Sequence, residues 1–252
     1  MTASVILILG IFLIALVLTM VGLGGGLIYS PLFVILGFAK SDAASASLFL
    51  NLIAAASAAF TYSQKKMVDY SLAIPLIVSS GLAAPIGSYF NSRVDTTPFM
   101  ITMAVVLALA GCRMLMKPPK QAEEMTIGPL KKFIGGFAIG VCIGLIGGFL
   151  GIGGGVFIVP LLIYVLNTPT KIAAASSTFI VCFSSLTGFL GYAAIKQINW
   201  HFILPAAVAS FAGGQAGARI MSARLKGKVI RIIFSLLLFA LCAKLVHQAW
   251  FQ

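Results

Sequence analysis

Apolar residues form long runs along the whole chain, and short polar or glycine-rich stretches separate them. Three of these runs, at 2–21, 43–60 and 229–243, approach or reach the length of about 20 residues that an α-helix needs to cross a bilayer. The strict alternation of apolar and polar residues that marks the strands of a membrane barrel is not found. The pattern therefore predicts an all-α polytopic membrane protein.

The second half of the chain repeats the first. Residues 22–26 read G-L-G-G-G, and residues 151–155, which lie 129 positions later, read G-I-G-G-G. Pro31 then aligns with Pro160 without a gap. Chance does not keep such a register over most of a chain, so we predict two tandem copies of one unit. The match covers roughly residues 5–116 and 134–246.

Each copy contains five apolar segments, and the second segment of each copy is short. A helix of 11 residues, at 1.5 Å per residue, covers about half of the hydrocarbon core. The first two segments of each copy, with the glycines between them, are therefore expected to form a broken or re-entrant element. The segments lie at 3–21, 27–37, 43–62, 70–90 and 98–116, and at 132–150, 156–166, 172–194, 201–221 and 228–249.

These segments predict eight long transmembrane helices and two short ones. The first repeat is expected at 1–116, a cytoplasmic linker at 117–129 and the second repeat at 130–252. Asp42, Asp69 and Asp95 each precede an apolar run, and Asn199 takes the place of Asp69 in the second copy. Because Asp and Asn side chains accept bonds from the free N–H groups of a helix start, these four residues are predicted N-caps.

The composition supports a membrane location. The chain is 60% hydrophobic and 9% charged, with a mean hydropathy of +1.10. Soluble domains carry roughly 25% charged residues, so this chain cannot cover a surface that faces water. The net charge of +12 does not come from a basic cluster with exposed aromatic residues. The expected partner is therefore the lipid bilayer and not a nucleic acid.

The positions of the lysines and arginines favour an odd number of crossings in each copy. In that arrangement thirteen of the 17 basic residues lie on one face and four on the other, whereas an even number divides them nine to eight. The positive-inside rule selects the first arrangement. It inverts the second copy relative to the first, and inverted repeats are a common construction of transporters. Both chain ends are then expected outside the cytoplasm.

The two glycine motifs are the first candidate binding elements. Glycines let the backbone turn sharply or approach a ligand closely, and inside a bilayer the freed N–H groups must line a cavity or bind something. A half-helix that starts after the glycines directs free N–H groups and the positive end of its dipole inward, which suits an anion. Close helix packing through small residues is the alternative. The candidate residues are Gly24, Gly25, Gly26, Gly153, Gly154 and Gly155.

Polar residues of the third segments are the second set of candidates. Ser47 and Ser176 are equivalent in the two copies, and Asn51 lies one helical turn after Ser47 on the same face. Hydroxyl and amide groups donate to an oxyanion without the cost of burying a charge. Ser177, and Gln215 within the stretch G-G-Q-A-G, complete the candidate substrate-binding residues. Hydrogen bonds between helices, or to a carbonyl one turn earlier, are the alternative for each of them.

Several kinds of chemistry have no residues to support them. All five acidic residues lie in predicted loops or at helix ends, whereas transporters of protons or cations usually place a carboxylate within the membrane. The two histidines lie far apart, and the four cysteines show no metal-binding spacing. We therefore expect neither an enzyme nor a metal site, and no cofactor.

At the glycine motifs the chain resembles the TauE/SafE sulfite-exporter family, also called the 4-toluene sulfonate uptake permease family. The likeness covers nearly the full length and lies in residues 22–26 with Pro31, in 151–155 with Pro160, in A-A-A-S-S at 173–177 and in G-G-Q-A-G-A-R at 213–219. The first copy departs from this pattern, because P-I-G at 85–87 replaces Q-A-G, so the two half-sites are expected to be unequal.

The resemblance implies a transporter, favoured as an exporter, of sulfite, organosulfonates or related anions across a bacterial inner membrane. Binding near the midplane and alternating access are expected for such a protein. A permease that imports another small anion and a scaffold subunit without transport activity stay open as alternatives, as does a homodimer.

Overall fold

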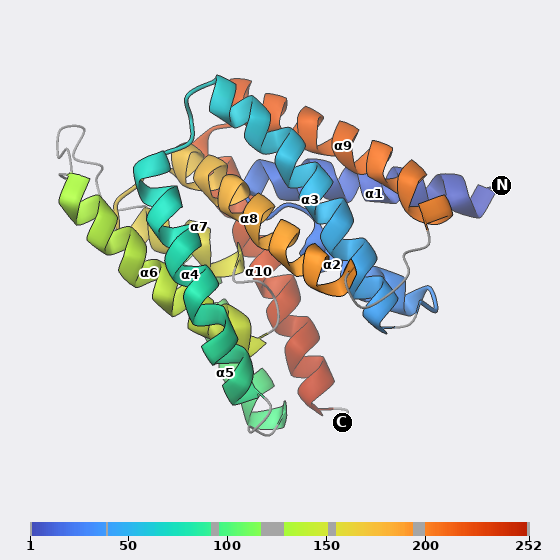
Figure 1. Cartoon of the computed structure of the whole chain (residues 1–252), viewed down its shortest axis with the longest axis horizontal. Helices are drawn as coiled ribbons and strands as arrows, with labels where there is room; N and C mark the ends of the chain where they lie inside the picture. The colour runs from blue at the N-terminus through green and yellow to red at the C-terminus, as the bar shows by residue number, and fades with distance from the viewer. Residues whose placement is uncertain are drawn as a thin grey trace.

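The computed structural model describes residues 2–38, 40–91, 96–116, 129–150, 155–193 and 200–250 (Figure 1). Regular structure within these ranges is entirely helical, which confirms the predicted all-α class. The helices are α1 (Thr2–Val21), α2 (Gly26–Ile35), α3 (Lys40–Gln64), α4 (Tyr70–Asn91), α5 (Thr96–Leu115), α6 (Pro129–Leu150), α7 (Gly155–Tyr164), α8 (Thr170–Ala193), α9 (Trp200–Ala223) and α10 (Gly227–Trp250).

Helix lengths follow the expected division. Of the described helices, α2 and α7 have 10 residues each and the other eight have 20 to 25. By length and composition, two described segments are able to cross a membrane, Ser45–Gln64 of α3 and Thr170–Leu190 of α8. Shorter apolar stretches lie in α1, α4, α6 and α7.

Large apolar side chains point outward from the helices. On α4, Ile74, Val78, Leu82 and Ile86 follow one another at a spacing of four residues, and each is 53–69% exposed. Monomeric proteins in water rarely show apolar patches of this extent. The outer surface is therefore suited to lipid acyl chains.

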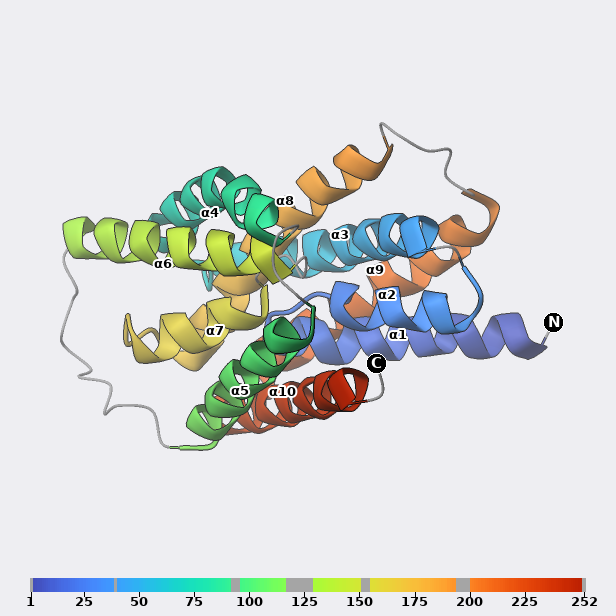
Figure 2. The same ribbon diagram turned by 90° about the horizontal axis from the view of Figure 1, so that it is seen from below.

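The two copies are intertwined. The fourth helix of each copy packs along the first helix of the other, so that α4 lies against α6 and α9 lies against α1 (Figure 1). Equivalent helices also pair with each other, α3 with α8 and α5 with α10, and the second of these pairs is visible in Figure 2. Each copy therefore depends on the other for the partners that cover its helices.

Glycines allow the close approach along both cross-copy pairs. A Cβ atom on Gly140 of α6 would lie 2.7 Å from the carbonyl oxygen of Leu76 on α4, and one on Gly144 would lie 2.8 Å from Ala83 Cβ. On α9, Cβ atoms on Gly213 and Gly217 would collide with backbone carbonyls of α1. These glycines therefore serve close helix packing.

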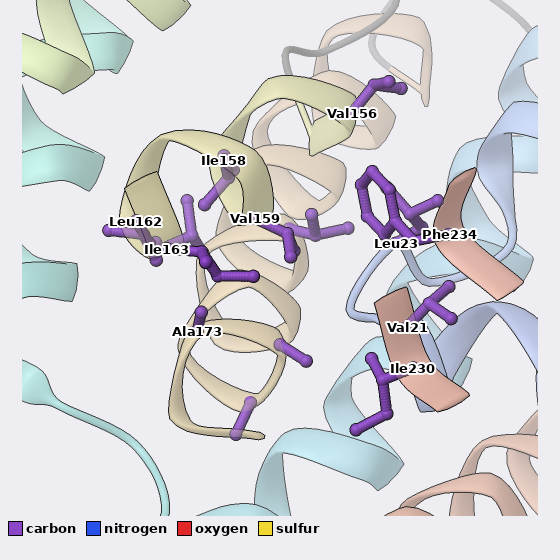
Figure 3. Packing of buried hydrophobic residues seen from close by; sticks show 14 of the residues in the cluster. Val21, Leu23, Val156, Ile158, Val159, Leu162, Ile163, Ala173, Ile230 and Phe234 are labelled. Carbon is purple, nitrogen blue, oxygen red and sulfur yellow. The ribbon is translucent and has the colours of Figure 1, made fainter. Parts of the chain in front are cut away.

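The main hydrophobic core joins α7, α8 and α10 to the end of α1. Figure 3 shows Val156 and Val159 of α7 on the side that faces Leu23, and Leu23 lies beside Phe234 of α10. Each of these side chains is at most 5% exposed. This core therefore holds α7 beside the break that follows α1, whereas Tyr29 and Phe33 of α2 are buried in a second cluster with α1, α3 and α9.

Helix boundaries correct some details of the sequence interpretation. Asp69 lies at the N-cap of α4, since its carbonyl accepts a bond from Ala73 N at 2.9 Å. Asp42 is not an N-cap, because α3 begins two residues earlier, and its carboxylate instead lies in the first turn, where the helix dipole favours it. Helix α6 begins at Pro129, because proline fits a first turn. Asp95 and Asn199 lie outside the described residues.

Candidate anion-binding site

The first glycine motif begins by ending α1. Gly22 N donates to Thr19 O at 3.3 Å and Leu23 N donates to Leu18 O at 2.9 Å, which is the bond pattern of a Schellman cap. The cap needs a left-handed residue after the helix, and Gly22 has a φ of +91°. The backbone thus leaves α1 abruptly inside the protein.

A hydrogen bond joins this turn to the second copy. Ser177 Oγ on α8 donates to the carbonyl oxygen of Gly22 at 2.7 Å. A Cβ atom on Gly22 would lie 2.7 Å from Ala174 O, so only glycine allows the turn to come this close to α8. The predicted site residue Ser177 is fully buried and positions the motif through the backbone.

The start of α2 directs two N–H groups at one acceptor. Gly25 N and Gly26 N both donate to Asn51 Oδ1 on α3, the second at 2.9 Å. The carbonyl of Gly25 accepts from Tyr29 N at 3.2 Å, so the helical ladder begins directly after these donors. The N-terminus of α2 therefore presents two converging N–H donors, and the binding of an anion by them stays a prediction.

Two further hydroxyl groups complete the polar network around Asn51. Asn51 Nδ2 donates to Ser185 Oγ on α8 at 2.6 Å. Ser47 Oγ donates to the carbonyl oxygen of Gly26 at 2.9 Å. The three side chains are at most 6% exposed, and all of them are uncharged. The network therefore joins α2, α3 and α8 in the interior.

The glycines of this motif are needed for space. A Cβ atom on Gly24, which has a φ of +70°, would overlap Asn51 Oδ1, and a Cβ atom on Gly25 would overlap the ring of Tyr29. Tyr29 cannot easily move away, because its ring is fully buried and its hydroxyl donates to Ile11 O at 3.0 Å. Substitution of Gly24 or Gly25 must therefore displace part of the network.

The described end of the second motif, Gly155, lies near the same side chain of α8 as the first motif does. Gly153 and Gly154 lie outside the described residues, but Gly155 begins α7 and is buried. A Cβ atom on Gly155 would lie 3.0 Å from Val181 Cγ2, and one on Gly24 would lie 3.3 Å from Val181 Cγ1. The two motifs thus approach opposite methyl groups of one side chain on α8.

The two half-sites differ in their polar partners. Ser47 bonds to the start of α2, whereas its equivalent Ser176 accepts from Asp69 N at 3.0 Å, at the beginning of α4. The two serines are equivalent in the repeat, but their hydroxyl groups contact different elements. Binding of substrate by Ser176 stays a prediction.

Gln215 lies away from the Asn51 network, at the contact between α3 and α9. Its Oε1 accepts from Thr61 Oγ1 at 2.6 Å and from Ser57 Oγ at 3.4 Å, where α9 packs on α3. Thr61 lies ten residues after Asn51, or about 15 Å along the helix. The structure does not bring Gln215 into the Asn51 network, and its role as a ligand stays a prediction.

Two members of the site were not selected from the sequence. Ser185 is one of several hydroxyl residues on α8, and nothing in its spacing separates it from Ser184. Val181 is an apolar residue among apolar residues and gives no signal at all. Only the fold, which brings α8 across α3 and between the motifs, identifies them.

The described surroundings of the site contain no acidic side chain in the polar network. The two acidic residues that the structure describes, Asp42 and Asp69, lie in the first turn of α3 and at the start of α4. No group of three His, Cys, Asp or Glu residues that could hold a metal ion occurs within the described ranges. The interior donors are therefore backbone N–H groups, an amide and hydroxyls, next to the positive end of a helix dipole.

An all-helical chain with an apolar exterior and interior helix breaks defines a polytopic membrane protein. The chain matches the family model "Sulfite exporter TauE/SafE" over residues 7–245, and it belongs to this family. The resemblance seen in the sequence motifs is thereby confirmed.

Several curated relatives are similar over almost the whole chain. The probable membrane transporter protein YunE of Bacillus subtilis is 26% identical over 257 residues, which cover 93% of this chain and 94% of that protein. A probable membrane transporter protein of Xylella fastidiosa (strain Temecula1) is 25% identical over 252 residues, with 94% and 93% covered. The archaeal protein MJ0441 of Methanocaldococcus jannaschii is 26% identical, with 72% and 69% covered. No solved structure was found to match the chain. The family and these relatives support a multi-pass membrane transporter.

Proposed function

We propose that the protein is an exporter of small sulfur-containing anions, such as sulfite or organosulfonates, in a bacterial inner membrane. The anion binds near the middle of the bilayer, between the two copies, and reaches either side by alternating access. The substrate class is drawn from the family, and the preference for an anion is drawn from the site.

The observation that carries this proposal is the convergence of Gly25 N and Gly26 N on one point of the interior. Two N–H groups at a helix start, with neutral donors around them, stabilise an oxyanion without a buried counter-charge. Sulfite and sulfonate groups offer several oxygens to such donors. The approach of Gly155 to Val181 adds the second helix start and supports a site shared by both copies.

Contacts of Lys65 and Lys171 with α9 support inverted copies. Lys65, which follows α3, donates to Ser222 Oγ at 2.7 Å, and Lys171, at the start of α8, donates to Ser222 O at 3.2 Å. The end of α3 and the start of its equivalent α8 therefore meet near the end of α9. Equivalent helices that run in opposite directions are the arrangement that alternating access between inverted repeats requires.

Flux into proteoliposomes tests the proposal. Wild-type protein is expected to move labelled sulfite or taurine across the membrane, and protein-free liposomes are not. Gly25→Ala is expected to abolish flux, because the new methyl group overlaps the Tyr29 ring. Gly10→Ala is the matched control, since a Cβ atom there meets nothing within 4 Å, and it should keep wild-type flux.

The outcome that contradicts the proposal is clear. Normal flux in folded Gly25→Ala protein would remove the glycine motif from the binding site. Absence of flux for every sulfur anion tested, with folded wild-type protein, would reject the substrate class. Flux that runs only inward under matched gradients would favour the importing permease over the exporter.

A further inference from the structure

The N–H groups of the proposed anion site are already occupied by a side chain of the protein. Asn51 Oδ1 accepts from both Gly25 N and Gly26 N, and the residue is only 6% exposed. An oxygen atom therefore lies at the position where an oxygen of a bound anion would accept the same two bonds. In this structure the carboxamide of Asn51 therefore occupies the two N–H donors of the site.

The other end of the same carboxamide is held by the second copy. Asn51 Nδ2 donates to Ser185 Oγ at 2.6 Å, on a helix 134 positions later in the chain. When Asn51 turns away from α2, this bond is also broken, and the oxygen of Ser185 loses the N–H group that it accepts. One side-chain movement thus exposes two N–H donors and releases a contact between the two copies.

In the sequence, only the first copy has an amide side chain at this position. Asn51 aligns with Ile180 in the second copy at the offset of 129 residues. An isoleucine cannot accept a hydrogen bond, so α8 offers no equivalent amide to the start of α7. Occupation of the N–H groups by a side-chain amide is therefore a feature of the half-site at α2.

We propose that Asn51 is an internal ligand that the substrate displaces, and that this exchange selects for oxyanions. A hydrogen bond to an ionised acceptor is roughly twice as strong as one to a neutral acceptor. The carboxamide oxygen is neutral, so a sulfite or sulfonate oxygen competes with it successfully, whereas a neutral solute does not. Because the substrate comes from the proposed function, this displacement rests on that function.

Substitutions of Asn51 distinguish displacement from direct binding. Asn51→Asp keeps the shape of the side chain and places a carboxyl group against the α2 start, so it should fold and should bind sulfite about 100-fold more weakly, because an ionised carboxylate holds the two N–H groups and repels the anion. Asn51→Ala removes the competing oxygen and should lower the Kd for sulfite by about tenfold. If Asn51 instead contacts the anion directly, Asn51→Ala weakens binding. Asn51→Ser, which is too short to reach both N–H groups, repeats the second test if Asn51→Ala does not fold.

The experiment measures binding of sulfite and taurine to purified full-length protein by calorimetry, with thermal unfolding as the check of folding. Ser79→Ala is the control, because the buried Ser79 hydroxyl bonds to Leu76 O of its own helix at 3.3 Å and, among the described residues, takes no part in the Asn51 network. Weaker binding in both Asn51→Ala and Asn51→Ser, or wild-type binding in Asn51→Asp, would overturn the displacement while leaving the anion site in place. A wild-type protein that binds neither anion would reject the proposed function itself.

Discussion

The side-chain amide of Asn51 on α3 donates to Ser185 Oγ on α8 at 2.6 Å, and this bond joins the two copies in the interior. The same carboxamide accepts from the backbone at the start of α2. In the proposed alternating-access mechanism, a movement of one copy against the other would stretch or exchange these bonds. The proposal therefore assigns the coupling of binding and movement to the Asn51–Ser185 pair.

Removal of the Ser185 hydroxyl should weaken the contact between the copies. Ser185→Ala is expected to lower the free energy of unfolding by about 0.6 kcal/mol, the average for interhelical hydrogen bonds in membrane proteins. Ser184→Ala is the matched control, because Ser184 Oγ bonds to Val181 O within its own helix at 3.1 Å. Unfolding in detergent, followed by circular dichroism, measures both variants. Equal stability of the two would show that the Asn51–Ser185 bond contributes nothing.

The seam between α4 and α6 should not tolerate larger side chains. Gly144→Ala places a methyl group 2.8 Å from Ala83 Cβ and against the backbone of Ser80, so the helices must separate. Overpacking of this kind costs about 1–3 kcal/mol. Gly81→Ala, on α4 itself, meets nothing within 4 Å and should be neutral. A melting temperature of Gly144→Ala protein equal to that of Gly81→Ala protein would contradict the close packing.

The helices were largely predictable, because apolar runs and breakers fix them locally. The glycines at 22–26 end one helix and begin the next, and a half-length helix follows in each copy, at α2 and α7. Asp42 was misplaced for a local reason as well. The polar residues Lys40 and Ser41 fit a first helical turn as well as Asp42 fits a cap, and the apolar pattern does not distinguish them.

The composition of the site was only partly predictable, because it depends on contacts across the chain. The glycine motif implied free N–H groups, but not that the oxygen of Asn51 would occupy them. Ser47 and Ser176 are equivalent in sequence, yet one contacts α2 and the other contacts α4. Val181 separates the two motifs and carries no polar group that a sequence pattern could reveal. Such roles follow from how α8 crosses the other copy.

Ser45 offers a test of function that is separate from stability. Its hydroxyl is buried and has no hydrogen-bond partner among the described residues, and it lies six residues before Asn51, about 9 Å along α3. An unsatisfied buried hydroxyl destabilises a protein, so Ser45→Ala should unfold at the same temperature as wild type or at a higher one. If this hydroxyl serves the passing anion, the same variant should transport sulfite more slowly. A clear loss of stability would show that Ser45 has a structural bond instead.

The direction of α10 decides the orientation of the whole protein. Lys228 and Lys244 are both exposed on this helix and lie 16 residues apart, or about 24 Å along its axis. The charge pattern places Lys228 on the cytoplasmic side and Lys244 on the opposite side. Cysteines introduced at these two positions, in a variant whose four native free cysteines are replaced by serine or alanine, form a matched pair on one helix.

A maleimide that cannot cross membranes should therefore label Lys228→Cys only in inside-out vesicles and Lys244→Cys only in right-side-out vesicles. Lys65→Cys should behave as Lys228→Cys does, because Lys65 and Lys171 meet at Ser222 near the start of α10. The reversed pattern would place both chain ends in the cytoplasm and contradict the orientation drawn from the charges. Labelling of Lys228→Cys and Lys244→Cys from the same side would mean that α10 does not cross the bilayer, and the inverted-repeat mechanism would lose its basis.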